Sequence, residues 1–264
     1  MNAPQSRGPV KLDRRVQIER HAPSAAVADL VRHYWIAHWA LPPGEEAVQQ
    51  VLTYPACNIV IEAGEAGLYG PSQGLSVRTL RGNSSAFGVL LRPSAGHLLT
   101  GRSPADFGEA VIPLPGGGTD AVADVREKLH HQDIGAAVAA FEEWIAPFAG
   151  NLTKEHRLVN RIVDLAEQSS GPTRVADLSV AVNVSERTLQ RLVLRVTGVT
   201  PKWLLHRRRL QDAAHLLNSL PGKDLTELAA ELGYADYAHF SRDFAATVGL
   251  TPRQFVDSQS SAIS

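Results

Sequence analysis

The spacing of hydrophobic positions divides the chain into two parts. Across residues 48–114, short apolar runs such as NIVIE alternate with Gly and Pro, which is typical of short antiparallel strands joined by turns. After residue 154, apolar residues recur every three or four positions almost to the end, as in consecutive amphipathic helices. The pattern therefore predicts an α+β chain with a β-rich first domain and an all-α second domain.

An aromatic segment precedes most of the predicted strands. Residues 29–43 contain Tyr34, Trp35 and Trp39 within an otherwise apolar run. We interpret these side chains as core anchors of a strand rather than as a ligand cage, because aromatic side chains mostly pack in protein interiors.

Two helices are predicted to end the first domain, near residues 119–131 and 133–148, with Thr119 as the cap of the first. The second has one apolar face, which we assign to packing within the domain, with a dimer face as the alternative. We place the first domain at residues 1–148, a linker at residues 149–153, the second domain at residues 154–257 and a tail at residues 258–264.

An internal duplication marks the second domain. LSVAVNVSERTLQRLVLRVTGVTP at residues 178–201 resembles LAAELGYADYAHFSRDFAATVGLTP at residues 228–252. Each copy has the pattern of a helix, a tight turn and a helix, since Asn183 and Gly233 tolerate the left-handed backbone that such a turn requires. Ser185 supplies an N-cap for the second helix of the first copy.

That second helix has two chemically different sides. Apolar side chains on one side are predicted to face the core: Leu189, Leu192, Val193 and Val196. Polar side chains gather on the other side: Arg187, Gln190, Arg191 and Arg195. Guanidinium and carboxamide groups can make paired hydrogen bonds to base edges in the major groove, and Arg also neutralises phosphates. A solvated charged stripe gives the same pattern, and the duplication favours DNA reading.

The second copy has a less basic surface. Phe240 and Phe244 are predicted to point inward, which leaves a short polar set on the outer side: Ala238, His239, Ser241 and Arg242. Arg242 is the residue that we expect to contact DNA, because it is the repeat partner of Arg191.

A predicted helix at residues 201–218 connects the two copies and would be roughly 26 Å long. This length would hold the two helix-turn-helix copies in successive major grooves. Arg207, Arg208 and Arg209 are spread around this helix. At least one of them is expected to face solvent and another to pair with an acid.

Charge supports this picture only locally. The whole chain has 26 Lys and Arg residues against 27 Asp and Glu residues, which distinguishes no class of partner. Residues 185–211, in contrast, carry seven basic side chains and one acidic side chain. This basic stretch coincides with the first predicted reading helix and is typical of nucleic-acid contact.

Taken together, SERTLQRLVLRVTGVTP, RRRLQDAAHLL and LTELAAELGYADYAHFSRDFAATVGLTPRQF resemble the tandem helix-turn-helix domain of the AraC/XylS family of bacterial transcription regulators, over about residues 158–256. The resemblance implies a sequence-specific DNA-binding transcription regulator. It implies base contacts in the first reading helix by Arg187, Gln190 and Arg191. In the second reading helix it implies contacts by Tyr237, Ala238, His239, Ser241 and Arg242. Val193 stands where the family usually has Phe, which implies a smaller core contact. Ala245 stands where it usually has Lys, which implies one phosphate contact fewer.

The first domain resembles a β-rich domain that accompanies such regulators, through YW at Trp35, YGPSQG and GVLLRPSAGHLL. By analogy with related sensors, the resemblance implies a cupin-like barrel that binds a small effector and dimerises through its helices. Double-stranded promoter DNA is the expected partner. RNA polymerase, a small-molecule effector and a second copy of the chain are further candidates.

Other classes find little support. The composition, 44% hydrophobic and 20% charged, excludes disordered and fibrous proteins. Cys57 is the single cysteine, so an intramolecular disulfide and a cysteine-clustered zinc site are excluded, and a buried apolar role is expected. GPSQG matches a nucleophile elbow, but a strand-like segment follows Ser72 where a helix is needed. We expect no metal and no cofactor.

The sequence shows no leader and no membrane span, so a cytoplasmic protein without membrane contact is expected. We expect a protein that is not an enzyme. Two alternatives stay open: an enzyme with its active site in the first domain, and a regulator whose first domain only dimerises.

Overall fold

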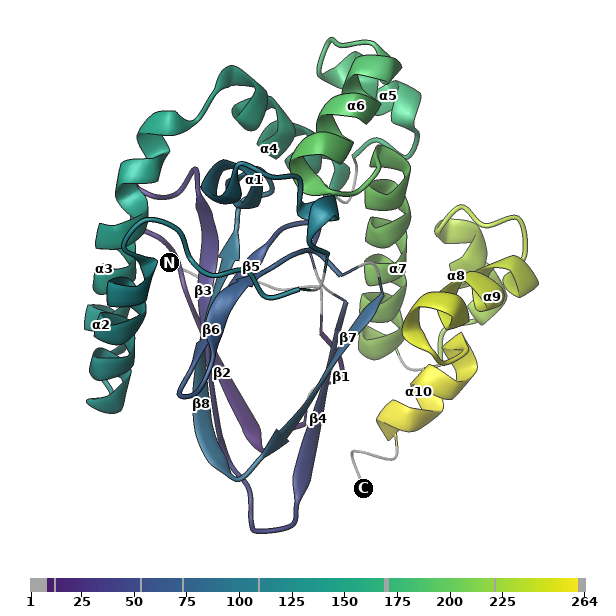
Figure 1. Ribbon diagram of the computed structural model, residues 1–264. Coiled ribbons are helices and arrows are strands. Elements are labelled where there is room, and N and C mark those ends of the chain that lie inside the picture. Colours follow the sequence, from purple (N-terminus) through teal and green to yellow (C-terminus); the bar gives the residue numbers. More distant parts are fainter. Residues whose placement is uncertain are drawn as a thin grey trace.

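The computed structural model describes residues 9–11, 13–52, 54–72, 74–108, 110–168, 171–220 and 222–260. Its first half is β-rich and its second half is helical, as the apolar spacing predicted (Figure 1). The strands are β1 (Pro9–Lys11), β2 (Val16–His21), β3 (Val31–Ala40), β4 (Glu46–Leu52), β5 (Asn58–Glu62), β6 (Ala66–Tyr69), β7 (Leu75–Arg81) and β8 (Asn83–Leu91).

The strands form two antiparallel sheets that face each other (Figure 1). The smaller sheet has the order β1-β4-β7, and the larger has the order β2-β3-β8-β5-β6. Within the described residues, no strand pairing joins one sheet to the other, so the expected cupin-like barrel is an open one. Side chains alternate between the two faces of a strand, so each sheet has one face towards the space between the sheets and one face away from it.

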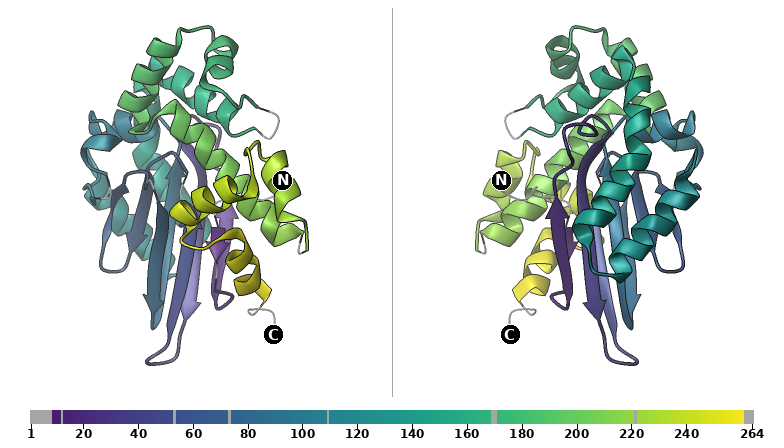
Figure 2. Two further views of the ribbon diagram at one scale, coloured as in Figure 1. Left: turned by 90° about the vertical axis from the view of Figure 1, so that its right-hand side faces the viewer. Right: turned by 90° about the vertical axis from the view of Figure 1, so that its left-hand side faces the viewer.

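The outer face of the larger sheet is covered by two helices, α2 (Gly118–His130) and α3 (Ile134–Ile145), as the right view of Figure 2 shows. Tyr34 of β3, Phe87 of β8 and Phe141 of α3 form the centre of this core, with ring centroids 5.8–6.0 Å apart. The apolar face of α3 is therefore used for packing within the domain. The cap of α2 is Gly117, with a φ of 75°, and the predicted cap Thr119 lies in its first turn.

Short helices lie at the boundary between the two domains. They are α1 (Ala95–Thr100), η1 (Pro104–Asp106) and η2 (Ala146–Asn151). The predicted linker at residues 149–153 overlaps η2, and Thr153 caps the next helix. Asn160 of that helix is buried between the domains, where it accepts a hydrogen bond from the Ser94 backbone at 3.0 Å and donates one to the Asp29 carbonyl at 3.3 Å.

The second half consists of α4 (Lys154–Ala166), α5 (Val175–Ala181), α6 (Glu186–Thr197), α7 (Pro201–Ser219), α8 (Leu225–Glu231), α9 (Tyr237–Val248) and α10 (Pro252–Ser260). The helix pairs α5–α6 and α8–α9 are the two copies of the duplication. Each pair packs on one end of α7 (Figure 1): Leu204 and Leu205 join the first core, and Leu210 and Leu217 join the second. The connecting rod is thus the common support of both units.

Candidate nucleic-acid interface and inter-sheet cavity

Helix α6 has the two faces that the sequence predicted. Ser185 caps it by accepting a hydrogen bond from the backbone N–H of Thr188 at 3.2 Å, and Asn183 in the preceding turn has a φ of 55°. The apolar side is buried: Leu189, Leu192, Val193 and Val196. The polar side is exposed: Arg187, Gln190, Arg191 and Arg195.

These exposed side chains differ in their partners. Arg187, Gln190 and Arg191 make no side-chain hydrogen bond to the part of the chain that the structure describes. Arg195 forms an ion pair with Glu155 of α4, and this hydrogen bond lowers the pKa of the Glu155 carboxyl. Arg187, Gln190 and Arg191 can therefore meet a ligand directly, whereas Arg195 must first exchange its carboxylate partner.

Helix α9 is the equivalent helix of the second unit. Gly233, in the turn before α9, has a φ of 75°. Asp236 caps the helix by accepting a hydrogen bond from the backbone N–H of His239 at 2.7 Å. Phe240 and Phe244 are fully buried, as predicted. Three of the predicted contact residues are exposed, namely Ala238, His239 and Arg242. The other two, Tyr237 and Ser241, are partly buried.

A polar cluster beneath α9 fixes the helix against α7. Asp243 accepts a hydrogen bond from the Tyr234 hydroxyl at 2.6 Å and lies 2.8 Å from His206 Nε2. The Arg209 guanidinium lies over the Tyr234 ring, 5.1 Å from its centroid. Burial and the neighbouring Asp243 carboxylate raise the pKa of Tyr234. Sequence reasoning missed this cluster, although the single acid between Phe240 and Phe244 was a signal of it.

The three consecutive arginines of α7 have different surroundings. Arg207 is 2% exposed and lies over the Trp203 ring, 5.4 Å from its centroid, and burial lowers its pKa to about 10. Arg208 is also buried, and its Nε donates to Asp212 at 2.6 Å, which confirms the expected internal pair. Arg209 is the partly exposed member, so Arg207 and Arg208 are the structural ones.

A cavity of about 650 Å³ lies between the two sheets and is lined from both of them. The prediction of core anchors is confirmed for Tyr34 and Trp39, which are buried, and Trp35 packs against the same cluster as Trp39; Trp35 and Trp39 also line this cavity, whereas Tyr34 does not. The register explains the division, since Tyr34 points to the opposite face of β3 from its two Trp neighbours. Polar side chains from both sheets also line the cavity, among them Arg20 and Gln49.

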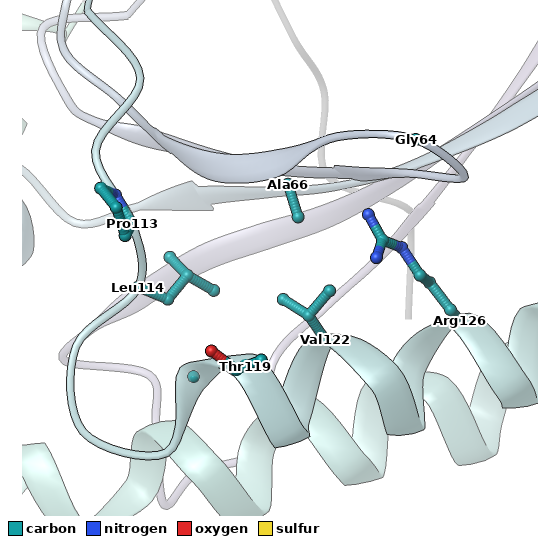
Figure 3. Close-up of a pocket in the computed structure, with 8 residues that line it drawn as sticks. Gly64, Ala66, Pro113, Leu114, Thr119, Val122 and Arg126 are labelled. Atoms are coloured by element: carbon teal, nitrogen blue, oxygen red, sulfur yellow. The ribbon is translucent and has the colours of Figure 1, made fainter.

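A smaller hollow of about 270 Å³ lies where α2 begins, below the turn that joins β5 to β6 (Figure 3). Ala66, Leu114 and Val122 point into it, and Arg126 closes one side by donating its Nε hydrogen to the Glu62 carbonyl at 2.8 Å. Thr119 and Arg126 are the polar side chains of its lining, and Arg126 is engaged with the Glu62 carbonyl, so the hollow offers a ligand little polar recognition.

Other chemistry has little support in the part of the chain described. No group of three or more His, Cys, Asp or Glu residues there is placed to hold a metal ion. No described helix has the length and apolar character needed to cross a membrane. Cys57 is buried, as expected, and burial raises the pKa of its thiol to about 12. After Ser72 the chain continues into strand β7, not into the helix that a nucleophile elbow requires.

His33, at the wall of the inter-sheet cavity, should make stability depend on pH. It is 4% exposed, and burial, followed by Arg20 and Arg32, lowers its pKa from 6.5 to about 4. Between these values the unfolded chain binds a proton that the folded protein does not bind. Stability should therefore be fully present above pH 6.5 and fall on acidification towards pH 4, by on the order of 1 kcal/mol for each pH unit.

Urea unfolding of the protein and of His33→Gln at a series of pH values checks this expectation. The variant should lose this part of the acid slope, whereas His131→Gln, at an exposed histidine, should keep it. Identical slopes for His33→Gln and the parent protein would contradict the assignment.

Comparison with known protein families gives one match in each half of the chain. Residues 178–258 match a family described as "Helix-turn-helix domain", and residues 19–113 match a family described as "Domain of unknown function (DUF6597)". The first match spans both helix-turn-helix units and α7 between them. The second begins within β2 and includes the strands from β3 to β8.

Curated relatives match over short segments. The HTH-type transcriptional activator RhaS of Escherichia fergusonii is 41% identical over 71 residues, which are 27% of this chain and 25% of the relative. The HTH-type transcriptional regulator YidL of Escherichia coli is 40% identical over 78 residues, 30% of this chain and 26% of the relative. The chain thus spans about a quarter of the length of these relatives.

A solved structure of a transcriptional regulator with an AraC-type DNA-binding domain, from Chromobacterium violaceum, is 26% identical. The match covers 42% of this chain and 96% of that chain, with a TM-score of 0.34. The sequence matches, rather than this superposition, carry the assignment, and they fall on the duplicated helix-turn-helix units. The carboxy-terminal part of the chain is therefore similar to the helix-turn-helix domains of transcription regulators such as RhaS and YidL.

Proposed function

We propose that the protein is a sequence-specific DNA-binding transcription regulator that reads a promoter with α6 and α9. The observation that carries the proposal is the pair of repeat-related arginines, Arg191 and Arg242. Both are exposed, and neither forms an ion pair with the part of the chain that the structure describes. Guanidinium groups free on the surface of a reading helix suit paired hydrogen bonds to guanine.

The two helices would contribute unequally. In α6, Arg187, Gln190 and Arg191 would contact bases, and Arg195 would contact a phosphate after leaving Glu155. In α9, Arg242 would make the strongest base contact, with weaker contacts from the four other predicted residues: Tyr237, Ala238, His239 and Ser241. Because both units pack on α7, the spacing of the two half-elements on DNA would be fixed.

Replacing Arg191 by Ala is expected to relax base preference at one position of the site, at a cost of about 1–3 kcal/mol in binding free energy. Selection of bound fragments from genomic DNA at about 150 mM salt measures this effect. Arg242→Ala should degrade a second half-element, about 10 base pairs from the first.

Arg14→Ala is the matched control, because Arg14 is exposed on a turn of the first domain. It should leave both half-elements unchanged. If Arg191→Ala weakened binding equally on all sequences, Arg191 would be a phosphate contact. If the parent protein enriched no fragment in buffer or in cell extract, the promoter-reading role would be lost.

We further propose that a small effector controls this regulator from the first domain. The inter-sheet cavity supports this role, because about 650 Å³ suits a small organic molecule. RNA polymerase and a second copy of the chain stay candidate partners.

A promoter-binding role also implies action in the cytoplasm. A first domain that only dimerises is the competing proposal, and effector-dependent thermal stabilisation would speak against it.

A further inference from the structure

The inter-sheet cavity contains a polar side chain that the protein leaves unsatisfied. Gln49 of β4 is 8% exposed and lines the cavity. Neither its side-chain oxygen nor its nitrogen has a hydrogen-bond partner among the described residues. Buried amides in folded proteins nearly always have partners, so an unsatisfied amide at a cavity wall marks a position where a bound molecule can supply them.

A flat aromatic surface forms part of the opposite wall. Trp35 of β3 is paired with Gly88 of β8, and a Cβ atom at Gly88 would lie 1.8 Å from Trp35 Cε2, so the indole rests directly on the backbone. The indole nitrogen donates to Asn58 Oδ1 at 3.2 Å, which holds the ring in this orientation. The absence of a side chain at Gly88 thus creates a surface suited to a planar apolar group.

Arg20 stands beside this surface. It is the strand partner of Trp35 on β2 and lines the cavity. No ion pair joins Arg20 to a carboxylate within the part of the chain described, whereas the cavity's Arg78 is neutralised by Glu62 at 2.9 Å. His33 is neutral near pH 7, because burial lowers its pKa to about 4. The wall therefore carries an uncompensated positive charge at Arg20.

We propose that the inter-sheet cavity binds a small organic anion with a flat apolar body, which rests against Trp35, pairs its acidic group with Arg20 and satisfies the amide of Gln49. The proposal deepens the effector-controlled regulator proposed above, on which its biological role rests, by naming the chemistry of the ligand. A guanidinium beside an aromatic face is well suited to a carboxylate or sulfonate on a ring system.

The cavity walls also contact both halves of the DNA-binding domain. Leu75 lines the cavity and packs, with Leu52, against the core of the second helix-turn-helix unit. Tyr54 lines the cavity and lies beneath the Arg32 guanidinium, which forms an ion pair with Glu167 at the end of α4. A bound molecule that moves either wall would thus act on the core of the second unit through Leu75, or on the end of α4 through Arg32.

Two fluorescent dyes with the same ring body test the proposal on the full-length protein without DNA. Anilinonaphthalene sulfonate carries a negative charge, and phenylnaphthylamine is neutral. We expect Arg20→Gln to weaken the sulfonate about tenfold or more and to change the affinity for phenylnaphthylamine by less than about twofold. Arg14→Gln, at an exposed arginine outside the cavity, should change neither.

Gln49→Leu gives a second, independent readout, because it removes the amide and keeps the volume. We expect it to weaken the sulfonate by about threefold to tenfold and to leave phenylnaphthylamine nearly unchanged. Unchanged sulfonate affinity in Arg20→Gln, or equal losses for both dyes, would overturn the proposal. Since no DNA is present, failure here leaves the promoter-reading proposal untouched, and failure of the Arg191 experiment leaves this one untouched.

Discussion

Replacing Phe240 by Ala should destabilise the carboxy-terminal domain by about 3–5 kcal/mol. Phe240 is fully buried, and its ring lies 5.2 Å from the Tyr234 ring and 5.7 Å from the Phe244 ring, centroid to centroid. Truncation leaves a cavity that these rigid rings fill only in part, so both the transfer free energy and the packing contacts are lost. The free energy of unfolding in urea measures the effect.

Phe240→Leu is the matched control, because it keeps most of the apolar volume and should cost no more than about 1.5 kcal/mol. The selectivity of the effect on DNA is equally informative. Phe240→Ala should degrade the half-element read by α9 more than the one read by α6, since the core of α5–α6 is a separate cluster. A urea midpoint equal to that of the parent protein would show that Phe240 does not support this core.

Replacing Gly198 by Ala should cost about 2–5 kcal/mol and loosen the contact between the domains. Gly198 ends α6 with a φ of 76°, which an L-residue adopts at a cost of about 1–2 kcal/mol. Its added Cβ would lie 2.6 Å from the backbone nitrogen of Ala105 and 3.0 Å from the carbonyl carbon of Pro104. Overpacking against this backbone adds about 1–3 kcal/mol or separates η1 from α6.

The duplication supplies the matched control at Gly249, which ends α9 with a φ of 80° and has no neighbour within 4 Å of an added Cβ. Gly249→Ala should therefore show the backbone cost alone, about 1–2 kcal/mol. The difference between the two variants in urea unfolding isolates the clash with η1. Faster hydrogen exchange around Pro104–Asp106 in Gly198→Ala, but not in Gly249→Ala, would show that the clash lies at η1. Equal losses in both variants would mean that η1 does not press on Gly198.

Much of the helix-turn-helix domain could be predicted because its signals are local. The Ser185 cap, the left-handed Asn183 and the inward Phe240 depend on neighbours within about one or two helical turns. The duplication then doubled the evidence, since Arg191 and Arg242 recur at the same place in two copies. Which of the predicted contact residues touch DNA stays a prediction.

The first domain could be predicted only coarsely. Strands and helices followed from periodicity, but the cavity that Trp35 lines did not, because the sequence does not reveal which face of β3 meets another sheet. The same uncertainty hid the unsatisfied Gln49, because β4 belongs to the other sheet. Side-chain burial in a sheet depends on partners that are distant in sequence, so a single strand cannot specify it.

The sequence by itself determined the helical domain, its two turns, its caps and the polar faces of its reading helices, because helix periodicity and capping act over a few residues. Only the tertiary structure decided three other features: the inter-sheet cavity with Arg20 and Gln49 at its walls, the Asp243 cluster that holds α9 on α7, and the contact of Gly198 with η1. Each depends on segments brought together from distant parts of the chain, where the geometry follows from packing rather than from local preference.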